Sequence, residues 1–202
     1  MLQTRRHVSL KTRWLMWRSR LSTPALLTRF DERKVVSLVA AVNGGLAILT
    51  IGVFAWLADL PLVFPALGPS AFILFSSPLS PGGAPRSVVL GHFAALACGC
   101  VAWRLLSFLA GAPVSLEAGG WSLFCSASLA LALSCLVLVR LSCPHPPACA
   151  SGLVVALGAV THWQDLLFMA LGIVWLTTQA VAMNRFAGLP VPAWSPRRGE
   201  TS

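Results

Sequence analysis

The chain has 202 residues, of which 56% are hydrophobic and only 10% are charged, and its formal net charge is +9. Soluble domains carry about 25% charged residues. A domain of this length also has too high a surface-to-volume ratio to hide so much apolar area from water. Length and composition therefore exclude an ordinary soluble domain and indicate a single membrane domain.

The positive charge is concentrated near the N-terminus. Nine of the fifteen Lys and Arg residues lie before position 35, where only Asp31 and Glu32 oppose them. A basic segment directly before a long apolar run is typical of a cytoplasmic flank, and it attracts anionic lipid headgroups. Because later elements carry no basic patch, we expect no nucleic-acid binding. An Arg-rich start that contains Ser and Thr also resembles an organellar transit peptide, which stays open as a minor alternative.

Four apolar runs are long enough to form membrane-spanning helices, which need about 20 residues. In chain order they are Val35–Leu57, Val88–Leu109, Ser122–Leu141 and Asp165–Asn184. They predict an all-α membrane protein, built as a helical bundle.

Two shorter apolar runs, Pro61–Ser77 and Pro144–Val160, each open with prolines. Proline lacks an N–H group and disfavours helix in the residue before it. Each run is therefore predicted to be an irregular entry followed by a short half-helix, Ser70–Ser76 in the first and Ala148–Val160 in the second.

The order long, short, long occurs twice along the chain. A local x-Pro-x-Ala pattern precedes both short helices, as Gly68-Pro69-Ser70-Ala71 and as His145-Pro146-Pro147-Ala148. This predicts an internal duplication with a period of about 75 residues, and an odd number of crossings in each half would make the halves inverted repeats, as in many secondary transporters.

The charges favour six crossings over four. With six crossings, Arg86 and Arg140 lie on the cytoplasmic side, whereas the predicted outer loops lack Lys and Arg and contain Asp59 and Glu117. This is the distribution that the positive-inside rule predicts. Arg104 is the residue that fits the six-crossing topology least well, because it lies near the outer end of its helix, and its side chain is expected to snorkel to the membrane interface.

These assignments divide the chain into three parts. We predict a basic cytoplasmic segment at 1–34, a transmembrane domain at 35–184 and a short basic tail at 185–202. The protein is expected to be a multi-pass protein of the cell inner membrane with its N-terminus in the cytoplasm. A homo-oligomer and a monomer both stay open.

The first candidate for a functional site is the start of the first short helix. Gly68 permits unusual backbone angles, and Ser70 would cap the half-helix or lie beside its N-terminus. Free N–H groups at such a terminus attract anions. The alternative is a plain proline-punctuated helix start.

Further candidates are His145 with the flanking Pro146 and Pro147, and the pair Arg86 and His92. The prolines would hold the imidazole of His145 on a stiff segment, and an ionisable group at membrane depth suggests function. The alternatives are an interfacial histidine in a turn, a topology anchor for Arg86, and a serine or backbone partner that satisfies a buried His92.

No motif for an enzyme, a metal site or a cofactor is present. The chain lacks paired carboxylates in its membrane region, and GxSxG, P-loop and HExxH motifs are absent. A lone histidine without ligand spacing makes a metal improbable, and the six cysteines read as small packing residues. We therefore expect no catalytic residue, no metal and no cofactor.

Several of these motifs occur together, and the combination resembles the HPP family of membrane proteins. They are His145-Pro146-Pro147-Ala148, Leu67-Gly68-Pro69-Ser70-Ala71, Ser77-Pro78, Pro85-Arg86 and Gly91-His92, and the resemblance covers roughly residues 30–185. The family is usually described with four transmembrane helices, and some plastid and cyanobacterial members are described as nitrite transporters.

The resemblance implies transport of a small inorganic anion, with nitrite as its most concrete form. It carries substrate binding over to Gly68, Ser70, Arg86, His92, His145, Pro146 and Pro147. The chain departs from the family pattern in having Ser87 where Asn is expected, and Cys149-Ala150-Ser151 where Gly-Ala-Thr is more usual, which leaves selectivity open.

Two further hypotheses stay open beside a transporter or channel. The first is a non-transporting membrane scaffold or assembly subunit that uses its Arg-rich N-terminus to hold a partner or anionic lipid. The second is a membrane enzyme acting on lipid, which would need a catalytic dyad that the sequence does not reveal.

Overall fold

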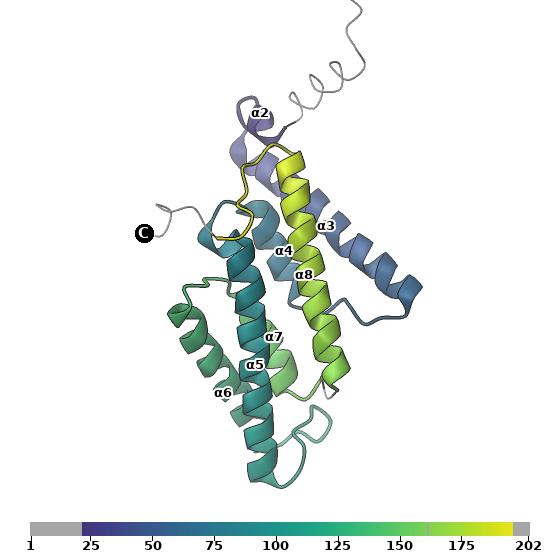
Figure 1. Ribbon diagram of the computed structural model, residues 1–202, viewed down its shortest axis with the longest axis vertical. Helices are drawn as coiled ribbons and strands as arrows, with labels where there is room; N and C mark the ends of the chain where they lie inside the picture. Colours follow the sequence, from purple (N-terminus) through teal and green to yellow (C-terminus); the bar gives the residue numbers. More distant parts are fainter. Residues whose placement is uncertain (1–21, 161, 196–202) are drawn as a thin grey trace, which may run out of the picture.

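The computed structural model describes residues 22–160 and 162–195, and every regular element among them is helical. The elements are α2 (Thr23–Leu27), α3 (Glu32–Ala58), α4 (Leu67–Ser76), the 3-10 turn η1 (Pro81–Gly83), α5 (Pro85–Ala110), α6 (Trp121–Arg140), α7 (Pro147–Ala156) and α8 (Trp163–Phe186) (Figure 1). Most of the predicted basic N-terminal segment, and Arg197 and Arg198 of the predicted tail, lie outside the described residues.

The four long helices confirm the four predicted membrane spans. Each of them is long and apolar enough to cross a bilayer. α3, α5 and α8 extend one to three residues beyond the apolar runs at both ends, whereas α6 begins and ends one residue earlier than its run, because helix bounds follow backbone hydrogen bonding and not hydropathy. At α3, for example, the side chain of Asp31 accepts a hydrogen bond from the N–H of Lys34 and caps the helix. At α5, Pro85 occupies the first helical position, where no N–H is needed.

The two short helices are also present, although their predicted bounds were wrong. α4 begins at Leu67, three residues before the predicted start, because Pro69 lies within the first helical turn, where proline is tolerated. α7 ends at Ala156 instead of Val160. Gly158 follows with a φ of +70° and forms the left-handed turn that commonly ends a helix.

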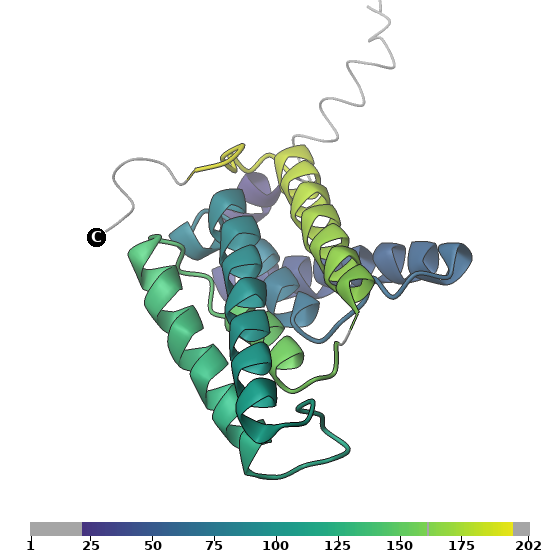
Figure 2. The same cartoon turned by 60° about the horizontal axis from the view of Figure 1, so that its bottom comes forward.

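Hydrogen bonds show which helix ends lie together. The N–H of Thr23 donates to the carbonyl of Ala187, and the N–H of Arg86 donates to Trp194. The guanidinium of Arg86 also donates to the carbonyl of Leu141. The starts of α3 and α5 and the ends of α6 and α8 are therefore at one end of the molecule (Figure 2).

The two halves of the described chain run in opposite directions. α3 and α5 run away from this shared end, whereas α6 and α8 run toward it (Figure 1). The chain must return between α3 and α5 through the segment that contains α4, and between α6 and α8 through the segment that contains α7. The described chain therefore passes between the two ends of the molecule six times. It does so in two inverted halves, each made of a long helix, a short helix and a second long helix.

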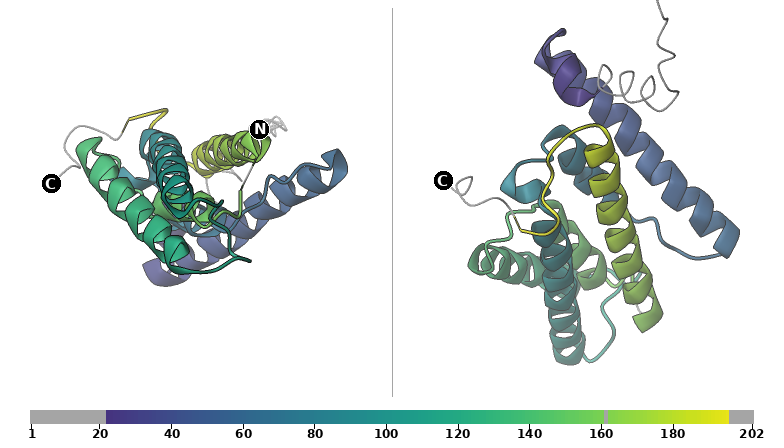
Figure 3. Two further views of the ribbon diagram at one scale, coloured as in Figure 1. Left: turned by 90° about the horizontal axis from the view of Figure 1, so that it is seen from below. Right: turned by 45° about the horizontal axis from the view of Figure 1, so that its top comes forward.

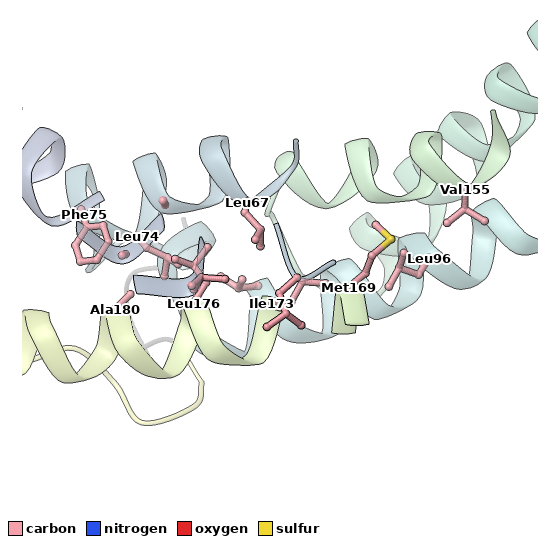
Figure 4. Packing of buried hydrophobic residues seen from close by; sticks show 14 residues of the cluster. Leu67, Leu74, Phe75, Leu96, Val155, Met169, Ile173, Leu176 and Ala180 are labelled. Carbon is pink, nitrogen blue, oxygen red and sulfur yellow. The ribbon is translucent and has the colours of Figure 1, made fainter. Parts of the chain in front are cut away.

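The halves are joined by crossed packing of their short helices. α4 of the first half packs against α8, and α7 of the second half packs against α5. A buried cluster from α3, α4, α5, α7 and α8 forms the main core, in which Leu67 and Leu74 face Ile173 and Leu176 of α8 (Figure 4). Between α5 and α7 the packing is closer, since the position of a Cβ on Gly152 would lie 2.6 Å from the carbonyl oxygen of Ala95.

Large apolar side chains cover the outside of this bundle. α3 lies at its side (Figure 3), and Leu38, Trp56 and Leu57 on this helix are 66%, 80% and 71% exposed. Phe108 on α5 is 83% exposed. A soluble protein rarely presents apolar surface on this scale, whereas lipid solvates it. The chain is therefore a multi-pass membrane protein.

Candidate functional site

Four polar side chains meet in the interior of the bundle. Ser70 comes from the first turn of α4, His92 from α5, His145 from the segment before α7, and Ser151 from α7. All four are 0% exposed. We call this group the Ser–His cluster. It joins both halves of the chain and lies where the starts of the two short helices come together.

The cluster is held by short hydrogen bonds. Ser70 Oγ lies 2.9 Å from His92 Nε2 and 3.0 Å from His145 Nε2. On the far side of the first ring, His92 Nδ1 lies 2.7 Å from Ser151 Oγ. On the far side of the second ring, His145 Nδ1 lies 2.8 Å from the carbonyl oxygen of Gly82. Every ring nitrogen therefore has a partner, as a buried imidazole requires.

Local sequence explains how the two rings can approach to a centroid separation of 5.1 Å. Pro144, Pro146 and Pro147 flank His145 and restrict its backbone. Gly91 precedes His92 and faces this segment, because a Cβ at Gly91 would lie 3.6 Å from His145 Cβ and 3.4 Å from Ala148 Cβ. The Gly-His and His-Pro-Pro motifs therefore pack directly against each other.

The hydrogen bonds of a neutral cluster have one direction. A carbonyl oxygen only accepts, so His145 Nδ1 carries the proton and donates to Gly82. His145 Nε2 must then accept from the hydroxyl of Ser70. Ser70 Oγ can accept in turn from His92 Nε2–H, and His92 Nδ1 accepts from the hydroxyl of Ser151. The chain of donors thus runs from Ser151 through both histidines to Gly82.

The cluster contains no negative charge. Its members are two imidazoles and two hydroxyls, and none of the carboxylates among the described residues is buried. The described residues also form no group of three or more His, Cys, Asp or Glu side chains suited to a metal ion. Its imidazoles and hydroxyls support hydrogen bonding and proton exchange.

Of the predicted site residues, the structure brings Ser70, His92 and His145 together. The serine partner considered for His92 is confirmed, because Ser70 and Ser151 occupy its two ring nitrogens. The cap considered for Ser70 is absent. Its Oγ lies 2.8 Å from the carbonyl oxygen of Ala66, and α4 has no side-chain cap.

The remaining predicted residues surround the cluster or lie away from it. Gly68 is exposed on the first turn of α4, Pro146 is exposed, and Pro147 is the buried first residue of α7. Arg86 is half-buried, and its guanidinium donates to the carbonyls of Leu141 and Ser142 at the end of α6. Arg86 is thus engaged with a helix end and contributes no hydrogen bond to the cluster.

Sequence reasoning missed two parts of the site. Ser151 was seen only as a departure from the Gly-Ala-Thr pattern, although this departure keeps a hydroxyl at its last position. Gly82 contributes a backbone carbonyl, which no residue type could reveal. The contact between Ser70 and His145 was also not visible in the sequence, because the two residues are 75 positions apart.

Comparison with known proteins identifies the family of the chain. The profile of the family described as "HPP, transmembrane region" matches residues 31–192, which is well over half of the chain. The chain belongs to the HPP family. The HPP match includes all four members of the Ser–His cluster and ends just beyond α8.

One curated relative of this HPP protein is described as a transmembrane protein of Dictyostelium discoideum. It is 25% identical over 134 residues, which cover 64% of this chain and 44% of the relative. The HPP chain thus matches less than half the length of that protein. No solved structure matches the HPP chain described here.

Proposed function

We propose that this HPP protein is a transporter or channel for a small inorganic anion, nitrite being the best candidate, and that it is not an enzyme. The observation that carries the proposal is the Ser–His cluster, a wholly buried group of hydrogen-bonding side chains in a membrane domain. Ionisable residues in such a position are costly and mark substrate or ion pathways.

The position of the cluster at the start of the short helices supports an anion as the substrate. Ser70 lies in the first turn of α4, and His145 lies two residues before α7. Transporters commonly place broken helices at their substrate site, with the positive ends of the half-helices toward anionic groups. Hydroxyl and imidazole hydrogens around such a site replace the water shell of an anion.

The conformation described is closed, since the cluster is inaccessible from either side. The four side chains are 0% exposed, and they form hydrogen bonds with one another. Entry of an anion therefore requires the helices that cover the cluster to separate. Alternating access by movement of one repeat against the other has this form.

The distribution of charge supports a cytoplasmic N-terminus in an inner membrane. Among the described residues, all basic side chains except Arg104 gather at the end where α3 and α5 begin and α6 and α8 end: Arg29, Arg33, Lys34, Arg86, Arg140 and Arg185. Asp59, Glu117 and Asp165 lie toward the opposite end. We assign the basic end to the cytoplasm by the positive-inside rule, where it would also attract anionic lipid.

A lipid hydrolase is the second candidate, because Ser70 and His145 stand at the distance of a nucleophile and its base. Ser70 Oγ, however, is surrounded by Ala66 and both histidines, and it is 0% exposed. A carbonyl carbon has no approach to it in this conformation. Labelling of Ser70 by a serine-reactive fluorophosphonate would favour hydrolysis over transport.

Uptake of nitrite into proteoliposomes tests the proposal. We expect wild-type protein to give saturable uptake above protein-free vesicles, and the double variant Ser70→Ala/His145→Ala to lose it. The matched control is Ser37→Ala/His162→Ala, which makes the same chemical changes at exposed positions. Each variant is compared by size-exclusion chromatography and circular dichroism, so that a folding defect is recognised. Unchanged uptake in a folded Ser70→Ala/His145→Ala protein would exclude the cluster as the transport site.

A further inference from the structure

We propose that the Ser–His cluster binds one proton together with the transported anion, so that the two ions cross the membrane as a neutral pair. This inference rests on the anion transport proposed above and adds the coupling ion to it. It follows from the partners of Ser70, from the charges around the cluster and from the reciprocity of coupled binding.

The surroundings of Ser70 provide a place for the proton. Three atoms lie within hydrogen-bonding distance of its Oγ: the carbonyl oxygen of Ala66 at 2.8 Å, His92 Nε2 at 2.9 Å and His145 Nε2 at 3.0 Å. A hydroxyl has one hydrogen but can accept twice. In the neutral cluster this one hydrogen has two acceptors, the carbonyl oxygen of Ala66 and His145 Nε2, and it cannot satisfy both at once.

Protonation of His145 removes this competition for the hydroxyl hydrogen of Ser70. A proton from water binds the lone pair of His145 Nε2, and the hydroxyl hydrogen of Ser70 rotates toward the carbonyl of Ala66. Ser70 Oγ then accepts from both imidazoles, and His145 Nδ1 continues to donate to Gly82. Only hydrogens change position, so the heavy atoms already suit the neutral and the singly protonated cluster. Release of the proton reverses the same steps.

A protonated cluster would carry an uncompensated charge. Among the described carboxylates, Asp31, Glu32, Asp59 and Glu117 are exposed, and Asp165 is half-buried in the first turn of α8, away from the end that contains η1. A buried ion without a partner costs several kcal/mol. The proton therefore does not bind to the cluster until a negative charge arrives.

The anion supplies that charge. When it enters beside His145, it pairs with the imidazolium and lowers the cost of burying it. Coupling of this kind is reciprocal, so the anion raises the affinity for the proton by the factor by which the proton raises the affinity for the anion. An empty cluster and a cluster holding both ions are electrically neutral, whereas a cluster holding one of them is not.

The elements around the cluster add no compensating carboxylate close to it. α4 and η1 carry no titratable or charged side chain. The titratable and charged residues of the other surrounding elements are Glu32, Arg33 and Lys34 on α3, Arg86, Cys98, Cys100 and Arg104 on α5, Cys125, Cys135 and Arg140 on α6, Cys143 before α7, Cys149 on α7, and Asp165 and Arg185 on α8. Among the cationic side chains of these elements, Arg86 donates its hydrogen bonds to carbonyl oxygens at the end of α6 and none to the cluster.

The decisive experiment measures proton movement with nitrite in proteoliposomes that contain a pH-sensitive dye. The pH is equal on both sides, and potassium with valinomycin holds the membrane potential at zero. We expect an inward nitrite gradient to acidify the lumen by one proton per nitrite, after subtraction of protein-free vesicles. Below saturation, doubling the external proton concentration doubles uptake, and a change of membrane potential leaves uptake unaltered.

The substitution His145→Gln identifies the proton acceptor, because an amide keeps hydrogen bonds but takes up no proton. We expect the ratio of protons to nitrite to fall from one to zero in H145Q. It should remain one in H162Q, where the same change is made at an exposed histidine before α8. If H145Q does not fold, nitrite added to wild-type protein in weakly buffered detergent must still remove one proton per bound anion from solution.

The outcomes separate the two proposals. Nitrite uptake that follows the membrane potential without acidification overturns proton coupling and leaves anion transport standing. Absence of any protein-dependent nitrite uptake overturns the proposed function itself. A ratio of one proton per nitrite in folded H145Q overturns the assignment of the proton to His145.

Discussion

Replacing Ser70 with Ala removes one oxygen atom and leaves two buried imidazoles without their shared partner. His92 Nε2 and His145 Nε2 both depend on Ser70 Oγ, and all three residues are 0% exposed. A buried polar group that loses its partner costs about 1–3 kcal/mol. With two such nitrogens, Ser70→Ala should lower the free energy of unfolding by about 2–6 kcal/mol. The lower end is expected, since hydrogen bonds between membrane helices average about 0.6 kcal/mol.

Ser87 offers a matched control for this prediction. It is also 0% exposed, and its Oγ has no hydrogen-bond partner. Ser87→Ala removes the same oxygen from the interior but leaves no other group unsatisfied, so the free energy of unfolding should stay the same or rise slightly. Both variants are measured by SDS titration in mixed micelles with tryptophan fluorescence and circular dichroism. Equal effects of the two substitutions would refute the hydrogen-bond network assigned to Ser70.

Three further predictions concern packing, topology and helix ends. Gly152→Ala should lower the free energy of unfolding by about 1–3 kcal/mol, because the new Cβ meets the backbone of α5. The control is Gly45→Ala, whose new Cβ meets nothing within 4 Å and which should leave the free energy of unfolding unchanged in the same titration. A cysteine at Ser77 should react with an impermeant maleimide from the side where α3 begins, and one at Glu117 from the opposite side. Labelling of the cysteine at 77 from the side where α3 ends would contradict six passes. Arg86→Gln should cost about 1 kcal/mol, because the two carbonyls at the end of α6 lose their donor, and an unchanged unfolding curve would contradict that role.

The architecture was largely predictable because lipid imposes simple rules on sequence. Long apolar runs had to be helices, and the prolines at 61, 65, 144, 146 and 147 had to interrupt them. The positions of Arg86 and Arg140, opposite Asp59 and Glu117, were enough to favour an odd number of passes in each half. The bounds of α4 were less predictable, because proline is tolerated in a first helical turn and does not mark where that turn begins.

The site was only partly predictable because it depends on contacts between distant segments. Ser70, His92 and His145 could be selected as polar residues in apolar surroundings, but nothing in their spacing showed that one hydroxyl would join both rings. Arg86 was selected by charge and motif, and its observed partners are backbone carbonyls of α6. Backbone groups such as the carbonyl of Gly82 have no counterpart in sequence, so the direction of the hydrogen-bond chain required the structure.

The crossed packing of the short helices has a consequence for how the protein enters its membrane. α4 has 10 residues, and a helix of this length covers about 15 Å of a hydrocarbon layer about 30 Å thick. The stretch 59–66 before it is not helical, and the carbonyl of Leu62 in this stretch is covered by α8 at Gly172. Asn184 of α8 likewise donates to the carbonyl of Leu74 in α4. Exposed peptide groups are costly in lipid, so the first half is fully shielded from lipid only after α8, the last described helix, has entered the membrane.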